Sequence, residues 1–491
     1  LYKFQLRMVI ENNKFIQKNN KVLHSTKHKE TVSLRKNVKK IFKKKPNCRI
    51  AEEFNQYFEN IAILPNEFVN VIENAKLKSK NPFEISNLIS SGLLYQLNIG
   101  LNQTDSKWAQ YNSLWVLKNL TVGTPVEIMA IFNTGIIHCV MPLILSNNVN
   151  ISDQALGCIG NVIGESFDFC TKIINIGFIN HIIQMLSNKL DIGIAETISW
   201  ILTNICNYAD YLMPDDVNQY IIPISSKLLA FNNVNISTNV WTGLSIISNN
   251  NNHNKLLDCL IENNVFSVSI PIPDTKNDNL IAEIINTFYG LSSSSRKVIE
   301  KIFTLDYLIN LIRVIGSHHD RSQKACISLI NSLVITNPVI IRRIHRGNVV
   351  NLILRKFVNC TNETIYRMMD LVNVILKNSS ADQLFDIDVS IVYYLVKHLK
   401  SHDNEMIQKC LEILYHLMNN NNSIKNMVAE EFEKDYFIDK LQFENENETI
   451  FKLSTKVLQL VSDDVKEDDV ISDGDKYFPE LYQLEETKFI F

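Results

Sequence analysis

Tryptophan and asparagine recur in pairs four residues apart, a spacing that suits the recognition of an extended peptide. Trp115 precedes Asn119 and Trp200 precedes Asn204 by four residues, which places each pair on one face of a helix. A carboxamide both donates and accepts hydrogen bonds, so a row of Asn side chains can hold a peptide backbone whatever its sequence. Indole rings can form slots for long aliphatic stems and attract their cationic heads, by roughly 0.5–2 kcal/mol per contact. The alternative is that these Trp residues are buried and structural.

The pairs belong to an internal repeat whose period follows from the numbering. Five segments share an apolar stretch, an Asn and a small polar turn, and the steps from each Asn to the next are 42, 43, 127 and 42. Because 127 is close to three times 42, we expect two further units, at VWTGLSIISNN (240–250) and INTFYGLSSSS (285–295). In these units Ser245 and Gly290 replace the Asn, and Trp241 precedes Ser245 by four residues. The Asn residues of the five segments are Asn119, Asn161, Asn204, Asn331 and Asn373.

This period predicts an all-α fold built from armadillo repeats. A helical period of about 42 residues is typical of HEAT or armadillo units, which stack on their neighbours to bury their apolar faces. Gly92, Gly135 and Gly177 interrupt apolar runs at equivalent places, and three helices per unit favour armadillo. We expect one right-handed superhelical solenoid over residues 66–462, in place of the roughly three domains that 491 residues would suggest. The chain contains only 14 Gly and 11 Pro, and this scarcity argues against propellers and sandwiches, which need frequent turns.

The charges are distributed unevenly along the chain. Residues 1–50 hold 15 Lys and Arg against Glu11 and Glu30, although the whole chain has a net charge of -3. Residues 463–491 hold ten Asp and Glu against three Lys. We therefore expect a basic arm over residues 1–60, an acidic body and an acidic C-terminal tail over residues 463–491. Such an arm can bind nucleic acid, an anionic membrane, an acidic protein or the chain's own body, or can serve only as a disordered solubilising tail.

Patterns for catalysis, metal binding and membrane insertion are missing from the sequence. The nine Cys form no CxxC pair, which indicates a reducing compartment with buried thiols. Gly157, Gly160 and Gly164 have neither the spacing nor the following Lys of a phosphate-binding loop. No nucleophile is paired with a base, and no apolar run reaches the roughly 18 residues of a membrane span. We expect a protein without enzymatic activity, metal, cofactor or membrane contact.

Together, the Trp-x-x-x-Asn ladder, the repeat period and the basic arm resemble the importin-α family, whose members carry proteins with basic nuclear localisation signals. KFIQKNNK (14–21) and VSLRKNVKKIFKKKPN (32–47) are similar to the family's importin-β-binding segment. FIDKLQFENENETIFKLSTKVLQLVSDD (437–464) is similar to the closing helices of the last repeat and the start of an acidic tail. The resemblance covers nearly the whole chain.

The resemblance implies two peptide-binding grooves. Glu165 stands where the family places the acid that pairs with the main lysine of the signal, and Gly123 stands where a glycine lines that pocket. The Trp expected four residues before Asn161 is Gly157, and Ile128 replaces a Thr near the lysine pocket. The implied major site consists of Trp115, Asn119, Gly123, Asn161, Glu165, Trp200, Asn204 and Trp241. The implied minor site keeps Asn331 and Asn373 but has Ile327 and Met369 in place of their Trp partners, so we expect it to be weakened.

The resemblance also implies partners and regulation. The arm would bind importin-β as a helix and, without importin-β, fold back into the major groove. A nuclear export receptor would bind around the last repeat, and the protein would shuttle between cytoplasm and nucleus. Two rival interpretations are a helical-repeat protein that binds nucleic acid through its arm and an armadillo scaffold for another extended partner. The residues implied in importin-β binding and autoinhibition are Arg35, Lys36, Lys39, Lys40, Lys43, Lys44 and Lys45.

Overall fold

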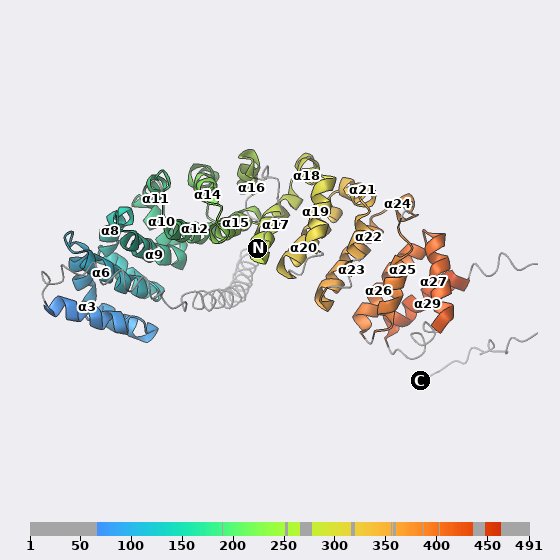
Figure 1. Ribbon diagram of the computed structural model, residues 1–491, viewed down its shortest axis with the longest axis horizontal. Coiled ribbons are helices and arrows are strands. Elements are labelled where there is room, and N and C mark those ends of the chain that lie inside the picture. The colour runs from blue at the N-terminus through green and yellow to red at the C-terminus, as the bar shows by residue number, and fades with distance from the viewer. Residues whose placement is uncertain are drawn as a thin grey trace, which may run out of the picture. The chain divides into compact units, whose positions relative to one another are not determined.

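The computed structural model describes residues 66–188, 190–250, 254–265, 277–315, 320–354, 356, 360–385, 387–401, 403–435 and 447–462. In these ranges the regular structure is entirely helical (Figure 1). The chain divides into two compact units, Leu1–Asn119 and Leu120–Phe491, which we call unit 1 and unit 2. The predicted arm and acidic tail lie outside the described residues.

The described part of unit 1 is one helical repeat followed by a long helix. Helix α3 packs against α4 and α5, and buried Phe68, Ile72 and Leu97 contribute to its core. Gly92 separates α4 from α5 at a φ of 80°, a left-handed conformation that favours glycine. The elements are α3 (Asn66–Lys78), η2 (Pro82–Glu84), α4 (Ile85–Ser90), α5 (Leu93–Leu101) and α6 (Lys107–Leu120).

Unit 2 is organised around a row of long helices, each of which packs against the next (Figure 1). Two of them, α15 and α17, occupy the places where the repeat period predicted units without an Asn. The row consists of α9 (Val149–Glu165), α12 (Ile192–Cys206), α15 (Val234–Ser248), α17 (Asp278–Tyr289), α20 (Asp320–Thr336), α23 (Asn362–Lys377), α26 (Asn404–Met418) and α29 (Glu448–Ser462).

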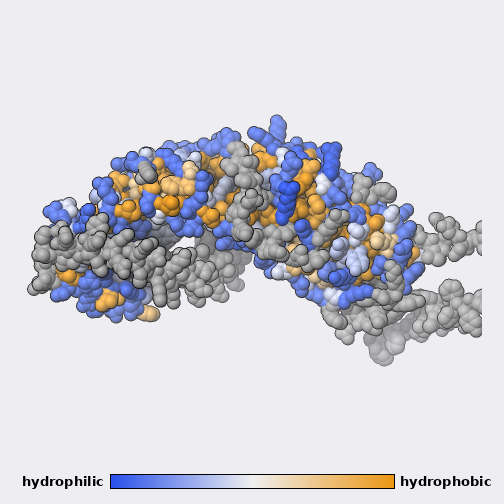
Figure 2. Space-filling view, viewed as in Figure 1, coloured by the Kyte–Doolittle hydropathy of each residue, from blue (hydrophilic) through white to orange (hydrophobic). Residues whose placement is uncertain are grey.

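Shorter helices cover one side of this row, and the other side keeps an exposed face. Contacts of α10, α14, α19, α25 and α27 with the neighbouring long helices build this second layer. In the space-filling view, hydrophobic and hydrophilic surface alternate along unit 2 (Figure 2). The shorter elements are α7 (Pro125–Asn133), α8 (Ile136–Val140), η3 (Met141–Leu145), α10 (Phe167–Asn175), α11 (Phe178–Leu186), α13 (Pro214–Asp216), η4 (Val217–Ile221), α14 (Ile222–Leu229), α16 (Asn254–Glu262), η6 (Gly290–Ser293), α18 (Arg296–Ile302), α19 (Leu305–Ile315), α21 (Pro338–Arg346), α22 (Val349–Leu354), α24 (Ala381–Phe385), α25 (Ile391–Leu399) and α27 (Asn422–Asp435).

Polar caps fix where the long helices begin. The side chain of Asn148 accepts hydrogen bonds from the backbone N–H groups of Asn150 and Ile151 at the start of α9. Asn233 caps α15 in the same way, within the same five letters, NVNIS. A side-chain cap of this kind typically contributes about 1 kcal/mol to helix stability. The caps of α12, α17, α23 and α26 are Asp191, Asn277, Thr361 and Asp403.

The glycines predicted to separate helices do so in unit 2 as well. Gly135 lies between α7 and α8 at a φ of 71°, and Gly177 lies between α10 and α11 at a φ of 96°. The chain bends by 74° at the first of these joints and by 67° at the second. The bends let the second helix of each repeat pack back against the long helix.

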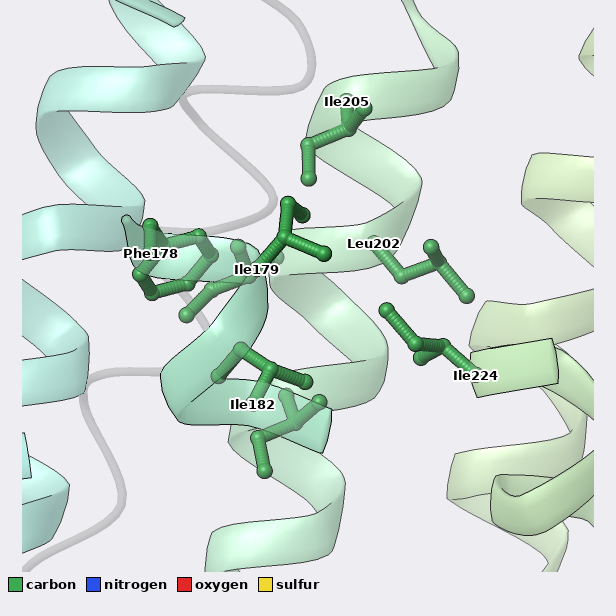
Figure 3. Close-up of a pocket in the computed structure, with 8 residues that line it drawn as sticks. Phe178, Ile179, Ile182, Leu202, Ile205 and Ile224 are labelled. Carbon is green, nitrogen blue, oxygen red and sulfur yellow. The ribbon is translucent and has the colours of Figure 1, made fainter. Parts of the chain in front are cut away.

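The core between the layers is apolar. Phe178 and Ile182 of α11 face Leu202 and Ile205 of α12, with Ile224 of α14 beside them (Figure 3). Burying a side chain of this size contributes roughly 1.5–3 kcal/mol, so stacking of neighbours supplies most of the stability of such an array. The predicted class, an all-α helical-repeat solenoid, is confirmed.

No single described helix is long and apolar enough to cross a membrane. The pairs Pro125–Asn133 with Ile136–Leu145 and Phe167–Asn175 with Phe178–Leu186 reach that length only when counted together across their bends. Among the described residues, no three His, Cys, Asp or Glu side chains are grouped so that they could hold a metal ion.

Candidate functional site

The pair Trp200 and Asn204 lies on the exposed face of α12. Both side chains are partly exposed, as are Glu196 and Thr197 one turn earlier on the same helix. Buried Ile198, Ile201, Leu202 and Ile205 occupy the opposite side of α12, where they meet the second layer. The apolar side of this amphipathic helix therefore fixes which side its Trp and Asn present to solvent.

Two glycines of α9 make room for this pair. A Cβ atom on Gly160 would lie 2.2 Å from Cζ3 and 2.8 Å from Cη2 of Trp200, so the indole ring packs directly on the backbone of α9. A Cβ atom on Gly164 would lie 3.1 Å from Nδ2 of Asn204. The sequence interpretation gave these glycines no role. The signal that identifies them is their spacing, because Gly160 precedes Trp200 and Gly164 precedes Asn204 by the same step, close to one repeat.

Three Asn side chains of the ladder are held by the preceding repeat. Asn161 donates from Nδ2 to Oγ1 of Thr121, and Asn204 donates from Nδ2 to the carbonyl oxygen of Gly160, both at 3.2 Å. In unit 1, Asn119 donates from Nδ2 to Oγ of Ser79, also at 3.2 Å. One hydrogen bond of this kind orients the carboxamide plane before any ligand arrives, which lowers the entropic cost of binding.

The exposed face of α9 and α12 is anionic. These helices carry Asp153, Glu165 and Glu196, all partly exposed, and their sequences contain no Lys, Arg or His. Asp153 Oδ1 accepts a hydrogen bond from Thr197 Oγ1 at 2.7 Å, which ties the two helices together. The next helix, α15, carries no charged residue at all.

Glu165 ends α9 beside an aromatic cluster. The hydroxyl of Tyr208 donates to the carbonyl oxygen of Ile163 at 2.8 Å, and burial, reinforced by Cys170 and Glu165, raises the pKa of Tyr208. Phe167 stacks on Tyr211, with ring centroids 4.5 Å apart. The Glu165 carboxylate is therefore close enough to Tyr208 to affect its pKa, and the rings of this cluster offer aromatic surface to the aliphatic stem of a lysine.

Gly123 and Ile128 lie around the start of α7. Thr124 and Glu127 form a capping box there, and a Cβ atom on Gly123 would lie 2.6 Å from Oε2 of Glu127. Gly123 is partly exposed, whereas Ile128 is 1% exposed and belongs to the core. Ile128 therefore contributes to core packing at the start of α7.

Trp241 differs from the expectation of an open indole ring. It is 6% exposed, and Ser245, one turn later, is 7% exposed and donates its hydroxyl to Glu283 Oε2 at 3.0 Å. The partly exposed face of α15 instead includes Thr238 and Thr242. Successive residues lie about 100° apart around a helix. The repeat step places Trp241 and Ser245 one residue away from the exposed register of α15, so both side chains face the interior.

The same difference appears on α23. Asn373 is 8% exposed and Met369 is fully buried, while Asp370 is exposed. Asn373 donates from Nδ2 to Glu412 Oε2 at 2.5 Å and is thus engaged by the next long helix. On α20, Asn331 remains partly exposed, next to buried Ile327.

Ion pairs bridge the long helices in this second half of unit 2. The carboxylate of Glu283, which is 5% exposed, pairs with Arg321 of α20. Lys324 pairs with Glu363 of α23 at 2.9 Å, and Lys409 of α26 pairs with Asp370. The carboxylates of Glu283, Glu363 and Asp370 therefore have cationic partners from the chain itself.

Comparison with known proteins gives a distant relationship. Importin subunit alpha-3 of Caenorhabditis elegans is 23% identical over 211 residues, which cover 42% of this chain and 40% of that protein. Importin subunit alpha-1b of Oryza sativa subsp. japonica is 19% identical over 240 residues, which cover 49% of this chain and 44% of that protein. The chain thus spans less than half the length of these relatives. No protein-family profile matches the chain.

Among solved structures, the crystal structure of an engineered protein matches with a TM-score of 0.59 at 17% identity, covering 80% of this chain and 95% of that one. This likeness concerns the fold. Together with the relatives above, it makes the chain an armadillo-like helical-repeat protein distantly related to importin-α subunits.

Proposed function

We propose that the chain is a nuclear import adaptor without catalytic activity, which binds Lys- and Arg-rich localisation signals on the exposed face of α9 and α12. The observation that carries this proposal is the partly exposed face of α9 and α12, where the carboxylates of Asp153, Glu165 and Glu196 accompany Trp200 and Asn204. Carboxylates attract cationic side chains, the indole ring holds an aliphatic stem, and the carboxamide binds the peptide backbone.

The repeat geometry suits an extended peptide. Neighbouring helices lie about 8–10 Å apart, whereas an extended chain rises about 3.3 Å per residue. One Asn from each helix, here Asn161 and Asn204, would therefore meet the peptide backbone about every third residue. Side chains between these points would enter the slots beside Trp200, with Glu165 as the partner of the principal lysine.

The resemblance to importin-α implies peptide contacts within each unit: Trp115 and Asn119 would contribute them in unit 1, and Gly123 would contribute one in unit 2. Trp241 would act indirectly, because its buried ring supports α15. Asn331 and Asn373 would form at most a weak second site, since Asn373 is buried and bonded to Glu412, and the Trp partners are replaced by buried Ile327 and Met369.

The basic arm would connect cargo to importin-β. Residues 1–60, with Arg35, Lys36 and the lysines from Lys39 to Lys45, would bind importin-β and compete with cargo when importin-β is absent. A tethered competitor acts at an effective concentration that can reach the millimolar range. Shuttling between cytoplasm and nucleus, with return by an export receptor, completes the proposed cycle.

Fluorescence anisotropy with a labelled lysine-rich peptide tests the site. Glu165→Lys should weaken binding by tenfold or more, because it replaces an attractive charge with a repulsive one. Glu262→Lys, an exposed substitution on α16 in the second layer, makes the same charge change as a control. Equal affinities of the two variants would remove Glu165 from the site.

The rival function is nucleic-acid binding through the arm. The 15 Lys and Arg among residues 1–50 favour this interpretation. Deletion of residues 1–60 separates the two. The adaptor gains affinity for the lysine-rich peptide because its internal competitor is gone, whereas a nucleic-acid-binding protein loses its binding to an oligonucleotide and gains nothing for the peptide.

A further inference from the structure

The ring of Trp115 already carries cations from its own unit. Nζ of Lys80 lies 5.4 Å and Nζ of Lys76 lies 5.8 Å from the centroid of the ring. Both distances are within the roughly 6 Å over which an ammonium group is attracted to an aromatic face. Ser79, between the two lysines, accepts the hydrogen bond from Asn119. The segment 76–80 therefore engages both members of the first Trp–Asn pair.

The two lysines differ in how they are held. Lys76 belongs to α3 and pairs with Glu73 at 3.2 Å, and its side chain is 26% exposed. Lys80 follows the end of α3 at Lys78 and is exposed. Lys80 is therefore the residue that can leave the ring and return to it without disturbing a helix or an ion pair.

We propose that Lys80 is a built-in competitor that keeps cationic side chains off Trp115. This inference rests on the proposed function and adds a rule to it: the ring of Trp115 in unit 1 disfavours cationic side chains of a peptide, whereas the face of α9 and α12 in unit 2 attracts them. Among the described residues, no lysine or arginine lies over the ring of Trp200.

The physical basis is competition for one ring face, together with charge repulsion. An incoming lysine must displace the ammonium group of Lys80 and also meet the positive charge of Lys76. At an exposed site the ring–cation attraction corresponds to about a two- to fivefold effect on affinity. Removal of Lys80 should therefore tighten binding of a lysine-rich peptide by about that factor.

The test compares Lys80→Gln with Lys78→Gln in the full chain. Both residues are exposed and both substitutions remove one positive charge, but only Lys80 lies over the ring. Anisotropy with the lysine-rich peptide should show two- to fivefold tighter binding for Lys80→Gln and a smaller change for Lys78→Gln. Equal changes would reduce the effect to net charge and overturn the proposal.

A second measurement works without any peptide. Labelling the four tryptophans with 5-fluorotryptophan gives fluorine resonances that single Trp→Phe variants assign. Lys80→Gln should shift the Trp115 resonance, and Lys78→Gln should leave it in place. If the chain binds no basic peptide even after deletion of residues 1–60, the proposed function fails, while this spectrum still decides whether Lys80 occupies the ring. An unmoved Trp115 resonance in Lys80→Gln contradicts the occupancy itself.

Discussion

Replacing Gly160 with Ala should push Trp200 off the backbone of α9. The added Cβ atom would lie 2.2 Å from Cζ3 of Trp200 and 2.8 Å from Cγ1 of Ile201, far inside van der Waals contact. Such overpacking costs about 1–3 kcal/mol, and the better helix propensity of Ala returns about 1 kcal/mol. The expected net loss of stability is therefore about 0–2 kcal/mol.

Gly164→Ala is the matched control on the same helix. Its Cβ atom would lie 3.1 Å from Nδ2 of Asn204, a carboxamide that can shift by a few tenths of an ångström. This variant should keep most of the propensity gain, so the two variants should differ by about 1–3 kcal/mol.

Urea unfolding followed by circular dichroism measures this difference as a shift of the midpoint, and tryptophan emission reports the displaced indole ring. Affinity for a lysine-rich peptide should fall about two- to thirtyfold in Gly160→Ala, the range given by the loss of one ring–cation contact. The reasoning is refuted if both variants have the same midpoint and the emission of Gly160→Ala is unchanged.

Two further predictions concern the second half of unit 2. Arg321→Ala should lower the free energy of unfolding in urea by about 1–2 kcal/mol, because it leaves the buried carboxylate of Glu283 with Ser245 as its remaining side-chain partner. The control Arg296→Ala breaks an exposed ion pair and should cost at most about 0.5 kcal/mol. Equal effects of the two variants would show that the burial of Glu283 is irrelevant. The hydrogen bond from Tyr366 to Asp403, aided by burial, raises the pKa of Tyr366 to about 12 from its usual value of 10, so its stabilising contribution is complete below pH 10 and is lost as the pH rises towards 12. Thermal melts should therefore depend less steeply on pH between 10 and 12 in Tyr366→Phe than in the wild type, and parallel profiles would contradict this assignment.

The repeat period was enough to predict the fold, because every unit buries the apolar faces of its helices against its neighbours in the same way. The Asn spacing predicts units at the positions of α15 and α17, and the glycine breaks predict the joints at Gly135 and Gly177. These features depend on local sequence, namely on helix periodicity and on backbone conformations that favour glycine.

The orientation of single side chains could not be predicted in the same way. Because the repeat step varies along the chain, it leaves the helix register uncertain by a residue, and one residue turns a side chain by about 100°. This is why Trp241 and Asn373 are buried although they stand at the positions that the repeat step of about 42 residues predicts. Contacts between units of the repeat, such as Trp200 on Gly160 or Lys80 over Trp115, join residues nearly one repeat apart. A single sequence identifies them only after the stacking is known.

Photo-cross-linking tests the central claim most directly. A lysine-rich peptide with one benzoylphenylalanine, irradiated with the full chain and mapped by mass spectrometry, should attach within residues 149–165 and 192–207, and an excess of unlabelled peptide should abolish the attachment. Attachment confined to the acidic residues 463–491, or to the second layer at α11 and α14, would contradict a peptide-binding face on α9 and α12.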